Sequence, residues 1–401
     1  MTISRRWCLQ WLLLLSLVTL TVAKHDPKSK YLLFVGTYTE KGSKGIYGYR
    51  FDTASSELTE LGVAAETTNP SFLAVDPSRH LLYAVNEVQK YRDASSGAVS
   101  AFAIDRQTGK LSLLNQVASR GADPCYIAFD KTGKYALVAN YTGGNVAIFP
   151  IDAKGRLGEP SAVLKNSGAL GPNKERQDAP HSHWIEASAH NHFVYVSDLG
   201  LDRVLIYRFD ATKGTLTNGA PPSSAAKSGS PIDSDFFSAT LAPGTGPRHV
   251  AFSDNGNFMY VLGELDSTVT VFANDDKETF RSIQRISALP SGFSGQNDAA
   301  EIAIHPNGKY LYTSNRGHDS IALFSIDSHT GALTLVDHFP TQGKTPRNFE
   351  IDPTGKFLFV ANQDSNNIVV FRIDSSSGRL TPTGQTVHVP SPVCLKFMAV
   401  D

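Results

Sequence analysis

Apolar and polar residues alternate along this chain in one pattern that recurs at intervals of about 50 residues. An apolar run precedes a polar turn such as Asn255-Gly256 or Asn307-Gly308, a second apolar run follows, and a third ends near an aspartate. Alternating β-branched and aromatic residues between Gly, Asn and Asp turns indicate strands joined by hairpins. A meander of three or four strands that recurs at this distance predicts the blades of a β-propeller.

Six copies of the pattern are complete, and the two ends of the chain supply parts of one more. The complete copies start near Asn69, Asp123, His181, Gly246, Ala299 and Thr345. The segment Tyr31–Asp52 holds only the second and third runs, and the segment 391–401 holds only the first. Joining the ends in one blade removes open sheet edges and fixes both termini. We therefore expect an all-β, seven-bladed propeller, because six or eight blades would leave one end fragment unpaired.

The first 23 residues have the organisation of a secretory signal peptide. Arg5 and Arg6 precede a leucine-rich apolar run, which ends in the small residues Val22 and Ala23. A charged start, an apolar middle and a small-residue end are typical of such signals. We expect residues 1–23 to be removed, residues 24–401 to form the propeller and the mature protein to be exported without stable membrane association. An uncleaved anchor helix is the alternative, and the paired arginines leave a twin-arginine route open.

Charge and cysteine content exclude several classes of protein. The formal net charge is −1, and removing Arg5 and Arg6 with no acidic residue would take it to −3. A chain near neutrality with no basic run is a poor nucleic-acid binder. Of the three cysteines, Cys8 would leave with the signal, and Cys125 and Cys394 are too few for a disulfide framework.

Most connections are short, but two long ones are rich in Gly, Ser and Pro. They cover residues 153–180 and 217–246, and each leads into the first strand of a blade. Long loops in compact domains are either functional or disordered. We expect at least one of them to act as a lid.

Propeller geometry predicts which polar residues meet. The first strand of a blade lines the channel, so its start and the end of the second strand lie on one face. A two-residue turn at Asn255-Gly256 would place Arg248 opposite Gly263 and diagonal to Glu264, where long side chains are within reach. The positions equivalent to Arg248 are held by Ser71, Cys125, His183, Ala300 and Arg347. Those equivalent to Glu264 are held by Glu87, Tyr141, Asp198, Arg316 and Gln363.

One mouth of the channel is therefore expected to gather a charged set that could bind an anion and supply acid and base groups. Its members are His183, Arg248, Arg347, Glu264, Arg316 and Glu301. His249 follows Arg248 in the first strand, and Gln363 holds the position of Glu264 in another blade, so both are added as substrate-binding candidates. Arginine suits bidentate capture of carboxylate or phosphate. The alternative is that these residues only satisfy strand ends and water.

Other chemistries have weaker support in the sequence. His181 and His183 lie two residues apart, but zinc usually takes three protein ligands and nearby arginines would repel it. No GxSxG elbow or phosphate-binding glycine loop is present. Cys125 has no evident activating base, which favours an inert thiol. We expect a reaction without metal or cofactor, in which a carboxylate or histidine activates water and an arginine stabilises the oxyanion.

Several segments resemble one known family. The runs "GPRHVAFSDNGNFMYVLGELDSTVTVF", "YLYTSNRGHDSIALFSID" and "TPRNFEIDPTGKFLFVANQDSNNIVVFRID" are similar to the lactonase family of seven-bladed propellers, and the similarity covers the chain from about Tyr31 to its end. That family includes bacterial 6-phosphogluconolactonases and fungal carboxy-cis,cis-muconate lactonizing enzymes. The resemblance implies metal-free lactone chemistry at His183, Arg248, Glu264 and Arg316. Gly263 stands where the family often has asparagine.

The resemblance leaves three functions to distinguish. Hydrolysis of a small anionic sugar lactone, of the 6-phosphogluconolactonase type, is the leading hypothesis, with Arg248, Arg316 and Arg347 holding the anion. Glu264 or His183 would activate water, and the other would protonate the ring oxygen. A muconate-type lactonizing cycloisomerase and a non-catalytic secreted propeller that binds a ligand are the alternatives.

Overall fold

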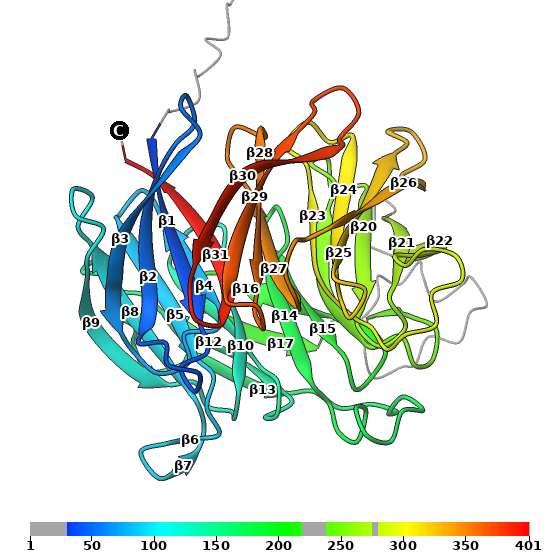
Figure 1. Cartoon of the computed structure of the whole chain (residues 1–401). Coiled ribbons are helices and arrows are strands. Elements are labelled where there is room, and N and C mark those ends of the chain that lie inside the picture. Colours follow the sequence, from blue (N-terminus) through cyan, green and yellow to red (C-terminus); the bar gives the residue numbers. More distant parts are fainter. Residues whose placement is uncertain (1–29, 219–237, 275–279, 401) are drawn as a thin grey trace, which may run out of the picture.

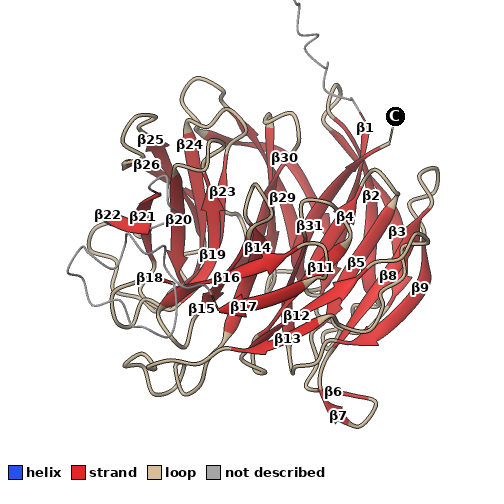
Figure 2. Ribbon diagram, turned by 180° about the vertical axis from the view of Figure 1, so that it is seen from behind, coloured by secondary structure: helices blue, strands red, loops and turns tan. Residues whose placement is uncertain are grey.

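The computed structural model describes residues 30–218, 238–274 and 280–400, and within them the chain is all-β, without a helix. Seven sheets of four or five strands stand around a central axis (Figures 1 and 2). This is the seven-bladed propeller that the repeat predicts. In the described part of the chain, no helix is long and apolar enough to cross a membrane.

Six blades follow one another along the chain. The first contains β4 (Leu73–Asp76), β5 (Leu81–Asn86), β8 (Ala98–Ile104) and β9 (Leu111–Ala118). The second contains β10 (Pro124–Phe129), β11 (Tyr135–Asn140), β12 (Asn145–Pro150) and β13 (Ala162–Lys165). The third contains β14 (Ser182–Ala187), β15 (Phe193–Asp198), β16 (Arg203–Asp210) and β17 (Thr215–Asn218), with β18 (Ser238–Thr240) also paired to β16.

The other three complete blades have the same strand order. The fourth contains β19 (Pro247–Phe252), β20 (Phe258–Gly263), β21 (Thr268–Asn274) and β22 (Phe280–Ser287). The fifth contains β23 (Asp298–Ile304), β24 (Tyr310–Arg316), β25 (Ser320–Ile326) and β26 (Leu333–Pro340). The sixth contains β27 (Pro346–Ile351), β28 (Phe357–Asn362), β29 (Asn367–Ile373) and β30 (Leu380–His388).

The seventh blade joins the two ends of the chain, as the end fragments predict. It contains β31 (Pro392–Ala399), β1 (Lys30–Thr37), β2 (Gly45–Asp52) and β3 (Glu57–Glu66). β31 pairs antiparallel with β1, with Leu33 opposite Phe397. A separate hairpin, β6 (Lys90–Tyr91) and β7 (Ala94–Ser95), is inserted after β5.

The first strand of each blade lies innermost. β4, β10, β14, β19, β23, β27 and β31 contact one another in this order, and β31 contacts β4, so the ring is closed. We call the face where these strands begin, and where the second strands end, the mouth. The turns that join first to second strands lie on the opposite face.

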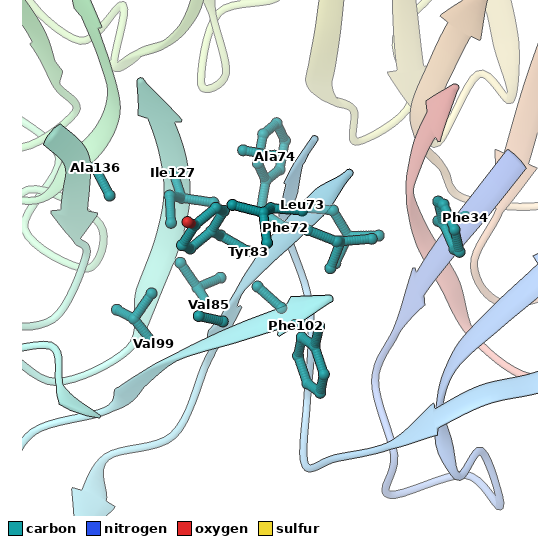
Figure 3. Packing of buried hydrophobic residues seen from close by; sticks show 14 of the residues in the cluster. Phe34, Phe72, Leu73, Ala74, Tyr83, Val85, Val99, Phe102, Ile127 and Ala136 are labelled. Atoms are coloured by element: carbon teal, nitrogen blue, oxygen red, sulfur yellow. The ribbon is translucent and has the colours of Figure 1, made fainter. Parts of the chain in front are cut away.

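The core lies between neighbouring blades and explains why these residues form strands. Phe34 of β1, Tyr83 of β5 and Ile127 of β10 belong to one buried cluster, although they come from three consecutive blades (Figure 3). Burying one such side chain stabilises the fold by about 1.5–3 kcal/mol. The Tyr83 hydroxyl also donates to the Gly155 carbonyl, which links two blades.

A β-bulge interrupts six of the seven inner strands close to the mouth. In β19, Val250 pairs with Val261, but Pro247 pairs with Gly263, so one residue on the β19 side has no partner. The predicted pairing of Arg248 with Gly263 is therefore wrong by one residue. The same one-residue shift occurs at Cys125, His183, Ala300–Glu301, Arg347 and Val393. Bulges often redirect side chains beside active sites, and here five of the six lie at positions equivalent to Arg248.

Candidate active site

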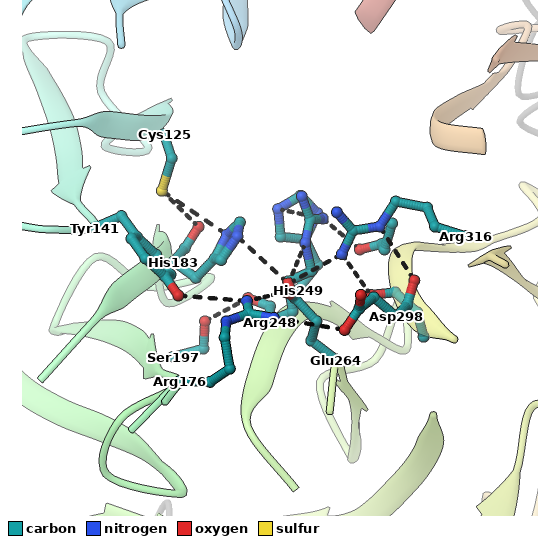
Figure 4. Close-up of polar contacts among 12 residues, drawn as sticks. Cys125, Tyr141, Arg176, His183, Ser197, Arg248, His249, Glu264, Asp298 and Arg316 are labelled. Carbon is teal, nitrogen blue, oxygen red and sulfur yellow. Dashed lines mark hydrogen bonds and ion pairs between the residues drawn. The ribbon is translucent and has the colours of Figure 1, made fainter. Parts of the chain in front are cut away.

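Glu264 lies at the centre of a group of charged side chains at the mouth (Figure 4). It directly follows β20, and its backbone N–H donates to the Gly246 carbonyl. The side chain is 4% exposed. Its Oε2 atom lies 2.9 Å from Arg248 Nε, 3.2 Å from Arg316 Nη2 and 3.8 Å from His183 Nε2. The four residues that the sequence singled out as catalytic thus meet at one carboxylate oxygen.

Arg248 is almost completely buried in the bulge of β19. Its Nη1 donates to the Ala300 carbonyl, and the hydroxyl of Ser197 donates to the Arg248 carbonyl. The contact of its Nε with Glu264 is an ion pair by distance, without the alignment of a hydrogen bond. Burial, with the charges of Arg316 and Arg347, lowers the pKa of Arg248 to about 10, so it remains a cation at neutral pH.

Arg316 ends β24 and is 14% exposed, which opens it toward the mouth. Its Nε donates to the Asp298 carbonyl over 3.1 Å. Burial lowers the pKa of Arg316, although the negative charge of Glu264 opposes that shift.

His183 occupies the bulge of β14 and is buried. Its Nδ1 lies 3.8 Å from Cys125 Sγ, and its ring packs edge-to-face on Tyr141. Burial and the charge of Arg248 lower the pKa of His183 well below its usual range, against the opposing effect of Glu264. The imidazole is therefore neutral at neutral pH and can accept or relay a proton.

The pKa of Glu264 is lowered well below the usual range for glutamate. Burial alone would raise it, but the positive charges of Arg316, Arg248 and Arg176 outweigh burial. Glu264 is therefore a carboxylate across the physiological pH range, and a weak base while all these groups surround it.

Arg176 is a member of the site that the sequence reasoning missed. Its Nη2 pairs with Glu264 Oε1, and its Nη1 lies 3.5 Å from Asp298 Oδ1. It comes from the connection between β13 and β14, one of the two long loops expected to include a lid. The other long loop runs through residues 219–237, which lie outside the described residues.

Similarity to known proteins, in sequence and in structure, indicates one family. The family described as "Lactonase, 7-bladed beta-propeller" matches residues 32–397. The 6-phosphogluconolactonase of Bacillus subtilis is 36% identical over 371 residues, which cover 92% of this chain and 99% of that protein. The chain belongs to the lactonase family.

Two further members of the comparison extend this lactonase-family similarity, one in sequence and one in structure. The 6-phosphogluconolactonase of Formosa agariphila is 36% identical over 325 residues, covering 80% of this chain and 86% of that protein. The solved structure of the Pseudomonas aeruginosa periplasmic gluconolactonase has a TM-score of 0.83 at 34% identity, and the match covers 93% of this chain and all of that one.

His249 and Glu301 lie one residue further along their strands than Arg248 and Ala300, inside the channel of the lactonase-family propeller. His249 Nδ1 bonds to Glu301 Oε1 over 2.9 Å, and Asn348 donates to Glu301 Oε2. Both His249 and Glu301 are buried. They therefore support the mouth from inside, and the prediction that they bind substrate stays a prediction.

Arg347 lies on another side of the mouth, in the bulge of β27. Its guanidinium stacks over the Tyr38 ring at 5.3 Å, and the Tyr38 hydroxyl donates to Glu87 over 2.9 Å. Burial would lower the pKa of Arg347, but the charges of Tyr38, Glu87 and Glu264 raise it. Gln363 directly follows β28 and is half-buried; its role also stays a prediction.

Gly263, directly before Glu264, stands where the structure leaves no room for a side chain. A Cβ atom at this position would lie 2.4 Å from Asp266 Oδ1 and 2.5 Å from Thr245 Cγ2. These distances are too short for a Cβ atom, so glycine at this position lets the loop before β19 and the turn after β20 approach each other. The next residue, Glu264, is held by its backbone bond to Gly246.

His181 and Cys125 lie beside the site. His181 precedes β14, and its ring bonds to Asp178 and to the Tyr141 carbonyl. Burial raises the pKa of the Cys125 thiol well above its usual value, which fits an inert group. Within residues 30–218, 238–274 and 280–400, no three His, Cys, Asp or Glu side chains form a group that could hold a metal ion.

Proposed function

We propose that this chain hydrolyses a sugar lactone that carries an anionic group, by metal-free acid and base chemistry at the mouth of the propeller. The observation that carries the proposal is the contact of one glutamate oxygen, Glu264 Oε2, with Arg248, Arg316 and His183. Relatives named 6-phosphogluconolactonase, matched over most of their length, support lactone hydrolysis as the reaction.

The charges around Glu264 favour an anionic substrate. Three arginines form ion pairs with this single buried carboxylate: Arg176, Arg248 and Arg316. Its negative charge also raises the pKa of Arg347. In the described ranges of the chain, the one other carboxylate that forms an ion pair with these arginines is that of Asp298, through Arg176. The surplus of positive charge, in a place of low exposure, would attract a phosphate or carboxylate and hold it by charge-assisted hydrogen bonds.

The hydrolysis can be assigned to the chain's own residues. Arg248 and Arg316 would lie against the carbonyl oxygen and stabilise its negative charge as a water oxygen bonds to the carbonyl carbon. Glu264 accepts one proton of that water. The bond from the carbonyl carbon to the ring oxygen then breaks, and the proton passes from Glu264, directly or through neutral His183, to the ring oxygen. The product is the open hydroxy acid, which releases its own proton to solvent.

The test is a comparison of hydrolysis rates with the spontaneous rates of the same lactones. Purified protein from residue 24 onward would be assayed with 6-phosphogluconolactone, with gluconolactone and with a lactone that lacks hydroxyl groups. We expect hydrolysis above background, fastest with the phosphorylated lactone. Rates equal to background for all three would overturn the proposal.

We further propose that the protein is exported, with cleavage after Ala23. The charged, apolar and small-residue pattern of residues 1–23, which lie outside the described residues, supports this. So does the similarity to a gluconolactonase that is itself periplasmic. N-terminal sequencing of the protein from its native host should begin at Lys24, and a chain that still begins at Met1 would contradict export by cleavage.

A further inference from the structure

The two carboxylate oxygens of Glu264 have different kinds of partners. Oε2 faces Arg248, Arg316 and His183, all of them on or at the ends of blade strands. Among the ion pairs of the described residues, Oε1 has one partner, Arg176, and Arg176 belongs to a connection between blades. At 37% exposure, its side chain is also the most exposed of the ion-paired arginines around Glu264.

The backbone that carries Arg176 is fixed in place. Gln177 is buried, its amide donates to the Leu199 carbonyl, and its backbone N–H donates to the Asn173 carbonyl. The Asn173 side chain accepts from the backbone N–H groups of Glu175 and Arg176. The Arg176 side chain can therefore change rotamer while the loop stays where it is.

A second carboxylate is within reach of the same guanidinium. Asp298 Oδ1 lies 3.5 Å from Arg176 Nη1, and the Asp298 side chain is 31% exposed. If Arg176 moved away from Glu264, it would still have a negatively charged partner. Its Nη1 atom can remain near Asp298 while Nη2 turns toward a ligand at the mouth.

This arrangement creates a conflict for hydrolysis. Glu264 must accept a proton from water, yet Arg176 covers Oε1 and the other groups surround Oε2. A phosphate or carboxylate offers arginine a bidentate partner in a more exposed position than Glu264 does. Moving Arg176 to such a group would uncover Oε1 and remove one of the positive charges that make the carboxylate a weak base.

We propose that Arg176 is the specificity-determining residue of the lactonase reaction: it releases Glu264 for catalysis only when the substrate brings an anionic group that takes Arg176 away. The inference rests on the proposed function, and it makes the anionic group a condition for rapid turnover as well as a handle for binding. A neutral lactone leaves Arg176 on Glu264 and reacts slowly even at saturation.

The test uses a matched pair of substrates, 6-phosphogluconolactone and gluconolactone, which differ only in the phosphate. For the wild type, Arg176→Gln and the control Lys174→Gln, kcat and KM would be measured for both. Lys174 is exposed on the same loop, so the control makes the same change of charge outside the site. We expect Arg176→Gln to raise kcat for gluconolactone at least threefold and to lower the preference for the phosphorylated lactone at least tenfold, with Lys174→Gln like the wild type.

A second readout separates release of Glu264 from simple binding of phosphate. Removing Arg176 should also shift the acidic limb of the kcat profile for gluconolactone to higher pH, because the carboxylate loses one stabilising cation. If Arg176→Gln changes only KM for the phosphorylated lactone, and leaves kcat and the pH profile for gluconolactone unchanged, the inference is wrong. A wild type that hydrolyses neither lactone would instead remove the proposed function itself.

Discussion

His249 donates its Nδ1 hydrogen to Glu301 over 2.9 Å and accepts a hydrogen bond at Nε2 from Arg248 Nη1 over 3.2 Å. A guanidinium can only donate, so the contact fixes the neutral tautomer with its hydrogen on Nδ1. Burial, followed by the charges of Arg248 and Arg347, also lowers the pKa of His249 well below its usual range. The imidazole thus fixes the Nη1 side of the Arg248 guanidinium, and the Nε atom of Arg248 faces Glu264.

Replacing His249 should weaken both the fold and the reaction. His249→Phe would leave an Arg248 N–H buried without this acceptor and would take one of two donors from Glu301 Oε1, which keeps only the Ile302 backbone N–H. An unsatisfied buried polar group costs about 1–3 kcal/mol. We expect a lower free energy of unfolding in urea and a lower kcat. His249→Gln keeps a donor and an acceptor and should lose less; equal losses for the two variants would show that ring volume, not hydrogen bonding, is what matters.

Glu264→Gln should remove most of the lactonase activity. A positioned general base contributes about 10²–10⁴-fold to a rate, so we expect kcat to fall by at least about 100-fold. The change also leaves buried arginines without their counter-charge, which can cost about 3–5 kcal/mol, so circular dichroism must show a folded variant at the assay temperature. Glu175→Gln, exposed on the loop, is the matched control. A folded Glu264→Gln with wild-type kcat would exclude Glu264 from the chemistry.

His183 should make stability depend on pH below neutrality. Its pKa is lowered in the folded state from an ordinary value of 6.5, first by burial and then by the charge of Arg248. Below about pH 6.5 the unfolded chain therefore binds a proton that the folded chain does not, and the free energy of unfolding falls by up to about 1.4 kcal/mol per pH unit. His183→Gln should make this slope shallower between about pH 7 and about pH 5, although His249, whose pKa is also lowered, still contributes.

Urea denaturation across that pH range measures the slope. His190→Gln removes a histidine from an exposed position and should keep the wild-type slope. If His183→Gln also keeps it, the imidazole is not held neutral by its surroundings.

Closure of the ring should depend on the core of the shared blade. Leu395 of β31 is fully buried in a cluster with Leu33 and Val35 of β1, whereas Leu113 is 60% exposed. Leu395→Ala should cost about 2–5 kcal/mol, as buried leucine truncations do. Leu113→Ala should change the free energy of unfolding by less than about 0.5 kcal/mol. Similar losses for the two variants would mean that β31 adds little to the ring.

The blades could be predicted because each repeat carries its own strand pattern and turn residues. The contact between Arg248 and Glu264 could be predicted from the blade geometry, since the start of a first strand and the end of a second strand lie on one face. The β-bulges were not predicted, because regular strand pairing gives each residue one partner on the neighbouring strand. A signal was available: proline stands directly before Cys125, Arg248, Arg347 and Val393. Proline lacks the N–H that a regular ladder requires there.

Arg176 could not be found in this way. It stands in the irregular segment "PNKERQDAP", which has no equivalent in other blades and therefore no register. Its position depends on side-chain bonds of Asn173 and Gln177 to the backbone. Such contacts are set by the folded surroundings, so neither periodicity nor spacing indicates them.

The joint between β31 and β1 also decides how the molecule can be attached to other objects. Val400 donates its backbone N–H to the Lys30 carbonyl, so the first and last described residues adjoin on the face opposite the mouth. A reporter domain, affinity tag or solid support coupled next to either residue would sit behind the propeller. Immobilised copies should therefore present their entrances to the surrounding solution.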